Sequence, residues 1–251
     1  MAVSGVVHLL AQTEVVQGPN ATTLMVLRWI HFLAGITWIG LLYFFNLVNV
    51  DFMRSLDAET RARILPPLLS RALWWFRWSS LVTVLAGLAY WMSIVSSDAH
   101  NAQMRGGHAI WTFFVIWTLA FAVENGLVTP GKGPLNNTWV VCILALIVVG
   151  VAGWLYVNTN NHGWESNRLL AIGVGGGMGW FLMLNVWGIV WRNNKKIIRW
   201  TSEHVANGTP IPEKAQKLAR QAYLVSRISA WLTIPLLFFM GAASHYPMLG
   251  K

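Results

Sequence analysis

The sequence predicts an all-α protein, a polytopic membrane helix bundle with six transmembrane helices. Hydrophobic residues make up 55% of the 251 residues and charged residues only 11%, which is far more apolar than a soluble domain. Apolar windows of about 20 residues, the length that crosses about 30 Å of hydrocarbon, occur six times. These windows are Leu24–Asn46, Leu73–Val95, His108–Val128, Thr138–Val157, Leu169–Trp191 and Tyr223–His245.

The windows divide the chain into one membrane domain and two short tails. Residues 1–23 lack the basic start, apolar core and small-residue cleavage site of a signal peptide, so we interpret them as an exposed N-terminal tail. Residues 24–246 are interpreted as a single six-helix membrane domain, and residues 247–251 as a short outer tail. The connecting segment LDAETRARIL is amphipathic, and PEKAQKLARQAY begins with Pro212 at a favoured first-turn position and runs into the sixth window. We expect both to be partly helical and to lie at the membrane surface.

Lysine and arginine residues give the orientation, because cytoplasmic loops of membrane proteins are enriched in both. The loops after the first, third and fifth windows hold twelve of them, against four on the opposite side. Both termini are therefore predicted outside, in the periplasm if the membrane is a bacterial inner (plasma) membrane. This asymmetry also accounts for the net charge of +9, so we expect a lipid bilayer and no nucleic acid as the partner.

The histidines lie mainly toward the outer side. His31 lies inside the first window, where an ionisable side chain costs about 2.5 kcal/mol or more unless it has a partner. His108 begins the third window and His245 ends the sixth, so three helices present imidazoles at similar depth. The histidines expected to be solvated are His8, His100 and His162.

Imidazoles that face a bundle interior are typical ligands of haem b in membrane cytochromes, whereas the single Cys142 excludes a CxxCH attachment of c-type haem. We therefore expect haem b, with His31 and His245 on the iron and His108 as the alternative partner. Zinc binds the same ring nitrogens, but no carboxylate or thiolate accompanies them at that depth.

One face of the first window connects His31 to Asn49. Gly35, Trp38 and Leu42 lie between them at roughly helical spacing, so this face is predicted to look inward. Gly35 is one turn from His31 and leaves room for a porphyrin edge. Trp38 is expected beside the same cofactor.

A second polar set lies toward the inner side. Arg77 is near the start of the second window, and Glu124 near the end of the third. Two interpretations remain open: a buried Arg77–Glu124 ion pair, or a clamp in which Arg77 and Arg227 bind an anionic substrate or a haem propionate. Hydrogen bonds from Asn185 and Asn49 are expected to support this set.

The run IGVGGGMGW also has two interpretations. Its overlapping pairs Gly173–Gly177 and Gly175–Gly179 are typical of close helix contact in membranes. The alternative is a flat porphyrin resting on the bared backbone.

Several separated motifs occur in order between about Arg28 and Pro247. They are HFLAGITWIGLLYFFNLVN, RALWWFRW, LNVWGIVWRNNKK, and SR followed by TIPLLFFM and SHYP. Together they resemble the membrane domain of the bacterial urate hydroxylases, whose longer members carry a cytochrome c domain at the C-terminus. The resemblance implies urate oxidation, with electrons leaving through a c-type haem. The residues His31, Trp38, Gly40 and Tyr43 are also similar to the first helix of the haem-binding protoporphyrinogen oxidase family.

Two functions follow from these observations. The first is a haem-b-type membrane oxidoreductase that oxidises urate or a similar heterocycle and passes electrons to a separate c-type cytochrome. The second is a non-catalytic electron-transfer or anchoring subunit of a larger respiratory membrane complex. No acid–base pair with an obvious catalytic spacing is present, so no residue is assigned to catalysis.

Overall fold

The computed structural model describes residues 19–129 and 137–249, and this part of the chain is helical without a strand. Six helical segments in it are long and apolar enough to cross a membrane. Five of the predicted windows lie within them, while the sixth helix stops at Ala242 and leaves His245 in the turn beyond. The six-helix prediction is therefore confirmed. His8 and most of the predicted N-terminal tail lie outside the described residues.

Two of the six segments change helix type along their length. Short π-helical turns, η1 and η2, interrupt the first and the fifth segment without breaking them. In chain order the elements are α2 (Pro19–Tyr43), η1 (Phe44–Asn49), α3 (Val50–Ser55), α4 (Ala58–Asn101), α5 (Gly107–Val128), α6 (Thr138–Asn160), α7 (Asn167–Asn185), η2 (Val186–Val190), α8 (Trp191–Asn207) and α9 (Lys214–Ala242).

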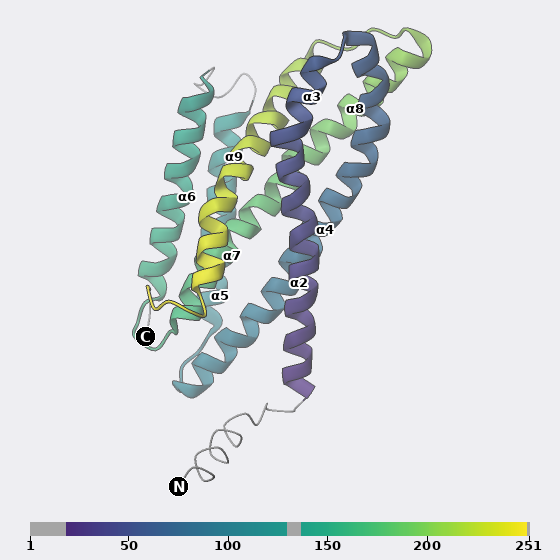
Figure 1. Cartoon of the computed structure of the whole chain (residues 1–251). Helices are drawn as coiled ribbons and strands as arrows, with labels where there is room; N and C mark the ends of the chain where they lie inside the picture. The colour runs from purple at the N-terminus through teal and green to yellow at the C-terminus, as the bar shows by residue number, and fades with distance from the viewer. Residues whose placement is uncertain (1–18, 130–136, 250–251) are drawn as a thin grey trace.

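The start of α2 and the end of α9 lie at the same end of the bundle (Figure 1), which we call the outer end because the charge asymmetry predicts it outside. Side-chain caps begin several helices. Asp57 accepts the Thr60 N–H at 2.9 Å at the start of α4, and Ser166 accepts the Leu169 N–H at 3.1 Å at the start of α7.

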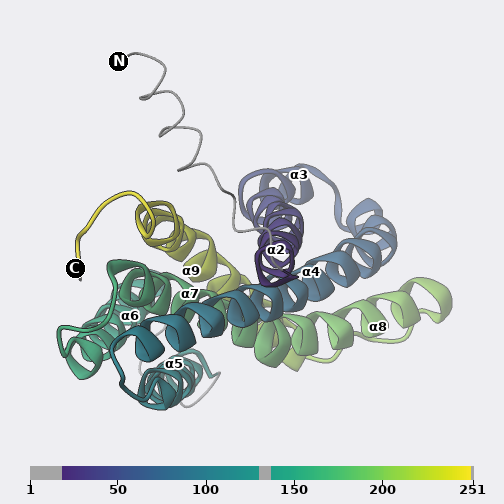
Figure 2. The ribbon, with the colours of Figure 1, turned by 90° about the horizontal axis from the view of Figure 1, so that it is seen from below.

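Both connecting segments are helical over most of their length, as predicted. PEKAQKLARQAY runs into α9, also as predicted, whereas LDAETRARIL is not a separate surface helix but continues into α4. The 44 residues of α4 correspond to about 66 Å, more than the roughly 40–45 Å of a whole bilayer. Figures 1 and 2 show α8 running away from α5 and α6, so the inner end of the bundle is extended on one side.

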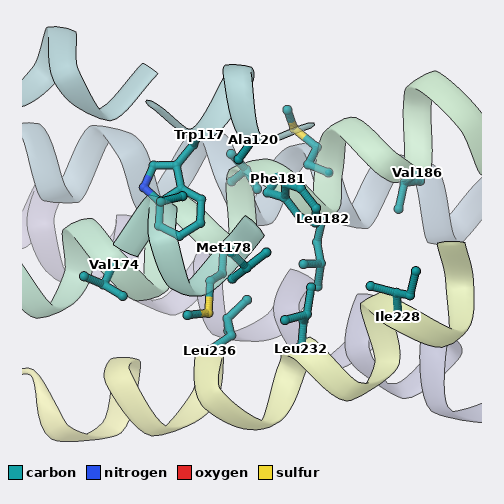
Figure 3. Close-up of a cluster of buried hydrophobic side chains, with 14 of the residues drawn as sticks. Trp117, Ala120, Val174, Met178, Phe181, Leu182, Val186, Ile228, Leu232 and Leu236 are labelled. Carbon is teal, nitrogen blue, oxygen red and sulfur yellow. The ribbon is translucent and has the colours of Figure 1, made fainter. Parts of the chain in front are cut away.

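The core of the bundle forms around α7, which contacts α4, α5, α6 and α9. In Figure 3, Met178 and Leu182 of α7 lie between Trp117 of α5 and the leucines Leu232 and Leu236 of α9. The glycine run makes this packing close. A Cβ at Gly177 would lie 1.8 Å from the Trp117 indole nitrogen, so this ring lies directly on the glycine backbone.

Gly173 has the same relationship to α6, because a Cβ there would lie 2.1 Å from the Tyr156 ring. The helix-contact interpretation of the run is thus confirmed for Gly173 and Gly177.

Candidate functional site

Helices α2 and α9 are hydrogen-bonded toward the inner end of the bundle. Tyr43 donates its hydroxyl hydrogen to Thr233 Oγ1 at 2.7 Å, since Thr233 itself donates to the Ala230 carbonyl at 2.6 Å. One turn further inward, Asn46 Nδ2 donates to Ser226 Oγ at 2.9 Å. Outward of these contacts, a cavity lies between the two helices.

This cavity has a volume of about 640 Å³, within the roughly 300–1,000 Å³ typical of small-molecule and cofactor sites. Helices α2, α4, α7 and α9 supply nearly all of its wall, and Phe113 is the contribution of α5. Most of the lining is apolar, and small residues bring the backbones of all four helices to its surface. The lining glycines are Gly35, Gly40, Gly87, Gly175, Gly176, Gly179 and Gly241.

His31 lies in this cavity with a fixed ring orientation. Its Nδ1 is 2.8 Å from the carbonyl oxygen of Thr83 on α4. A carbonyl can only accept, so Nδ1 carries the hydrogen and Nε2 keeps its lone pair. Metal-ligating histidines usually have this arrangement, in which the second ring nitrogen donates to a carbonyl or carboxylate.

The neighbouring turn of α4 is shaped to receive the imidazole. A Cβ at Gly87 would lie 2.8 Å from both Nδ1 and Cε1 of His31, so the ring packs against bare backbone. Gly35 also lines the cavity, but a Cβ there would meet only Thr83 Cγ2 at an ordinary 3.6 Å.

His245 lines the same cavity from the turn that follows α9, and Trp38 lines it from α2. The turn is held by Asn167, whose side chain is buried near the start of α7. This amide donates to the carbonyls of Ala243 and Tyr246 at 3.1 and 2.8 Å, and accepts from the N–H groups of Met248 and Leu249. His31, His245, Gly35 and Trp38 therefore all line one cavity.

His108, the alternative ligand, lies elsewhere. Its Nδ1 is 3.2 Å from Asn160 Oδ1 on α6, and its ring lies edge-on to that of His162 with 5.8 Å between centroids. His162 is exposed, as expected, and its Nδ1 is 2.8 Å from the buried carboxylate of Glu165. His108 and His162 thus lie together outside the cavity that His31 and His245 line.

Arg77 and Glu124 do not form the ion pair that one interpretation expected. The guanidinium of Arg77 lies over the rings of Trp78, Trp187 and Trp191, at 5.1, 5.0 and 4.1 Å from their centroids. Both carboxyl oxygens of Glu124 are buried without a hydrogen-bond partner. Aromatic faces, rather than a carboxylate, compensate the Arg77 charge.

Arg227 bonds to the π-helical turn η1. Its Nη1 donates to the Asn46 carbonyl at 2.9 Å, an oxygen exposed where the regular α-helical bonding pattern is interrupted. The turn also shifts the helix face, so Asn46, and not Asn49, faces α9. Asn49 keeps a buried side-chain oxygen without a partner. None of Arg77, Arg227, Glu124, Asn185 and Asn49 lines the cavity.

Three of the cavity residues that the sequence did not predict, Arg28, Thr83 and Gly87, bear directly on the site. Arg28 was counted only as an outer-side charge, yet it lines the cavity with its guanidinium 5.8 Å from the Phe32 ring centroid. Its position about one turn outward of His31 on the same helix was the available signal. Thr83 and Gly87 gave no signal, because their role depends on which part of α4 faces His31.

These features define a class: a six-helix membrane protein with a histidine-containing cavity at the outer end of its bundle. A family model described as "urate oxidase N-terminal" matches residues 20–251. The chain therefore belongs to the urate oxidase N-terminal family, and the resemblance inferred from its motifs is confirmed. Neither a curated protein nor a solved structure matched the chain.

Proposed function

We propose that this protein is a haem-b-type membrane oxidoreductase that oxidises urate or a similar flat heterocycle and passes electrons to a separate c-type cytochrome. Family membership supports the substrate class. The proposal of haem b rests on the hydrogen bond from His31 Nδ1 to the Thr83 carbonyl. This bond leaves Nε2 available to bind iron in a cavity that His245 also lines.

The residues present fit such a group. His31 would hold the iron through Nε2, with its tautomer and ring plane fixed by Thr83, and His245 would be the second ligand. The glycines of α2, α4 and α7 leave room for a flat macrocycle against the helix backbones. When bound, haem would supply one-electron redox chemistry.

Arg28 is the one permanently charged side chain among the residues that line the cavity. A guanidinium binds a carboxylate or a planar anion through two parallel hydrogen bonds, so Arg28 would hold either a haem propionate or an anionic substrate. This role replaces the one expected for Arg77 and Arg227, which lie outside the cavity lining.

One observation favours the alternative, a non-catalytic electron-transfer or anchoring subunit of a larger respiratory complex. Among the residues that line the cavity there is no Asp or Glu to serve as a general base. His31 and His245 would both be occupied by iron, which leaves the cavity without a free imidazole for proton transfer.

Spectra and activity of the purified protein test the proposal in two stages. After expression with ample haem, the parent should show a reducible Soret band that His31→Ala abolishes and that His108→Ala and His204→Ala leave unchanged. A colourless parent, or a full Soret band in His31→Ala, would overturn the cofactor assignment. Loss of urate with oxidised cytochrome c as the acceptor would then identify an enzyme, whereas haem without urate turnover would identify the subunit.

A further inference from the structure

A second polar site lies in the bundle, outside the cavity lining. Glu124 of α5 and Asn185 of α7 are both 0% exposed, and the side-chain oxygens and nitrogen of both lack a hydrogen bond of ordinary geometry. Helices α5 and α7 pack against each other, and the Asn185 amide is close enough to interact with the Glu124 carboxyl. Each residue lies about five helical turns from the outer end of its helix, so the two share the inner half of the bundle.

No charged group compensates Glu124 from the helices packed around it. Arg77 of α4 lies over tryptophan rings, and Arg227 of α9 donates to the Asn46 carbonyl. The titratable side chains of α6 are Cys142 and Tyr156, and Arg168 of α7 lies at the opposite end of its helix. Within the described residues, Glu124 also takes part in no ion pair.

A carboxylate buried without a cation is far more costly than the neutral acid, and a buried group of this kind binds a proton instead. The neutral acid has one donor and one accepting carbonyl. A primary amide has the matching pair, an accepting oxygen and a donating NH₂ group. The two side chains can satisfy each other's hydrogen-bonding groups completely only when Glu124 is protonated.

We infer that Glu124 carries a proton at neutral pH and that Glu124 and Asn185 together form an intramembrane proton-binding site. The acid O–H donates to Asn185 Oδ1, and Asn185 Nδ2 donates to the remaining carboxyl oxygen. The site borders η2, which begins directly after Asn185, and α5 ends about one turn beyond Glu124 at Val128. The proton is therefore held about a turn from the inner end of α5, away from the histidines that line the cavity. This inference is independent of the proposed haem.

Infrared spectroscopy of the full chain in lipid vesicles tests the site directly. At neutral pH the parent should show the C=O band of a protonated carboxylic acid. Glu124→Gln should lose this band, and Asn185→Leu should shift it to the higher frequency of an acid without a hydrogen-bond partner. Glu59→Gln, at an exposed carboxylate paired with Arg63, is the matched control and should leave the band unchanged.

Three outcomes would overturn the inference. The first is that the parent shows no such band at neutral pH, and the second is that the band persists in Glu124→Gln. The third is that the band disappears when sodium replaces choline at constant pH, because the site would then bind sodium. A second measurement needs only the parent protein, so it remains valid if a variant folds poorly. Because the folded protein holds a proton that the unfolded chain releases above about pH 4.3, the Tm of the parent should fall as the pH rises from about 5 through neutral. An unchanged Tm across that range would also contradict the inference that Glu124 is protonated.

Discussion

The Gly87 backbone lies directly against the imidazole of His31, so close that a Cβ there would be 2.8 Å from two ring atoms. We predict that Gly87→Ala displaces the ring, breaks its hydrogen bond to Thr83 and strongly reduces haem content, measured as the Soret absorbance per protein. Alanine otherwise favours a helix by about 1 kcal/mol over glycine, so the effect should appear without loss of helical structure.

Gly150→Ala is the control for Gly87→Ala, because Gly150 of α6 lies outside the cavity lining and its new methyl group would meet no atom within 4 Å. A general effect of replacing a helical glycine by alanine would appear in both variants. Equal haem content in the parent, Gly150→Ala and Gly87→Ala would contradict the proposed packing of His31 against Gly87.

Asn167 is predicted to position His245, since its amide makes four hydrogen bonds with the segment around this histidine. Asn167→Ala should change the electron paramagnetic resonance signal of the ferric haem in the same direction as His245→Ala. Asn158→Ala, which removes an exposed amide bonded only within its own helix, should not. A parent-like signal in Asn167→Ala would show that the turn needs no such support.

Arg227 is predicted to stabilise the π-helical turn η1 through its bond to the Asn46 carbonyl. Arg227→Ala should lower the free energy of unfolding by about 1.5–3 kcal/mol, the usual contribution of a hydrogen bond to a charged group. In Arg199→Ala, which breaks an exposed pair with Glu203, the loss should stay below about 1 kcal/mol. Denaturation of the detergent-solubilised proteins provides the comparison, and similar losses in both would contradict the prediction.

Arg77 and Glu124 are predicted to act independently, because their side chains form no ion pair and Arg77 is held by tryptophan rings. In a double-mutant cycle of Arg77→Met and Glu124→Gln, the coupling free energy should be below about 0.5 kcal/mol. A coupling free energy well above 1 kcal/mol would contradict this prediction and support the Arg77–Glu124 ion pair that the sequence suggested.

The bundle is predicted to place its basic inner end in the cytoplasm, because cytoplasmic loops are enriched in lysine and arginine. A reporter fused after Lys251 should be active outside the membrane, and one inserted near Asn207 should be active inside. The reverse pattern would place the cavity and both of its histidines at the cytoplasmic side.

Much of the fold was predictable because each span needs about 20 apolar residues, and such windows are easily recognised. The ends were less predictable. Hydropathy shows where a helix leaves the apolar layer, but not whether the helix continues into water. The predicted window therefore begins at Leu73, whereas α4 begins at Ala58.

The candidate site was predictable only in part. His31, Trp38 and Leu42 share a face because regular α-helix connects them, but η1 breaks that period before Asn49. Asn46, which the predicted inward face did not include, is the residue that bonds to Ser226 of α9. Gly87 and Thr83 depend on a contact between two helices, which no periodicity within one helix reveals.

The central position of α7 also bears on how the protein is made. Its glycine face is covered on one side by α5 and α6, and on the other by Leu236 and Phe239 of α9, the last of the six described membrane-spanning segments in chain order. Until α9 is inserted, Gly175 lacks the close helix contact that its missing side chain makes possible. His245 arrives with the same helix. Completion of the bundle and assembly of the cavity are therefore one event in biosynthesis, so a nascent chain that stalls before α9 has neither.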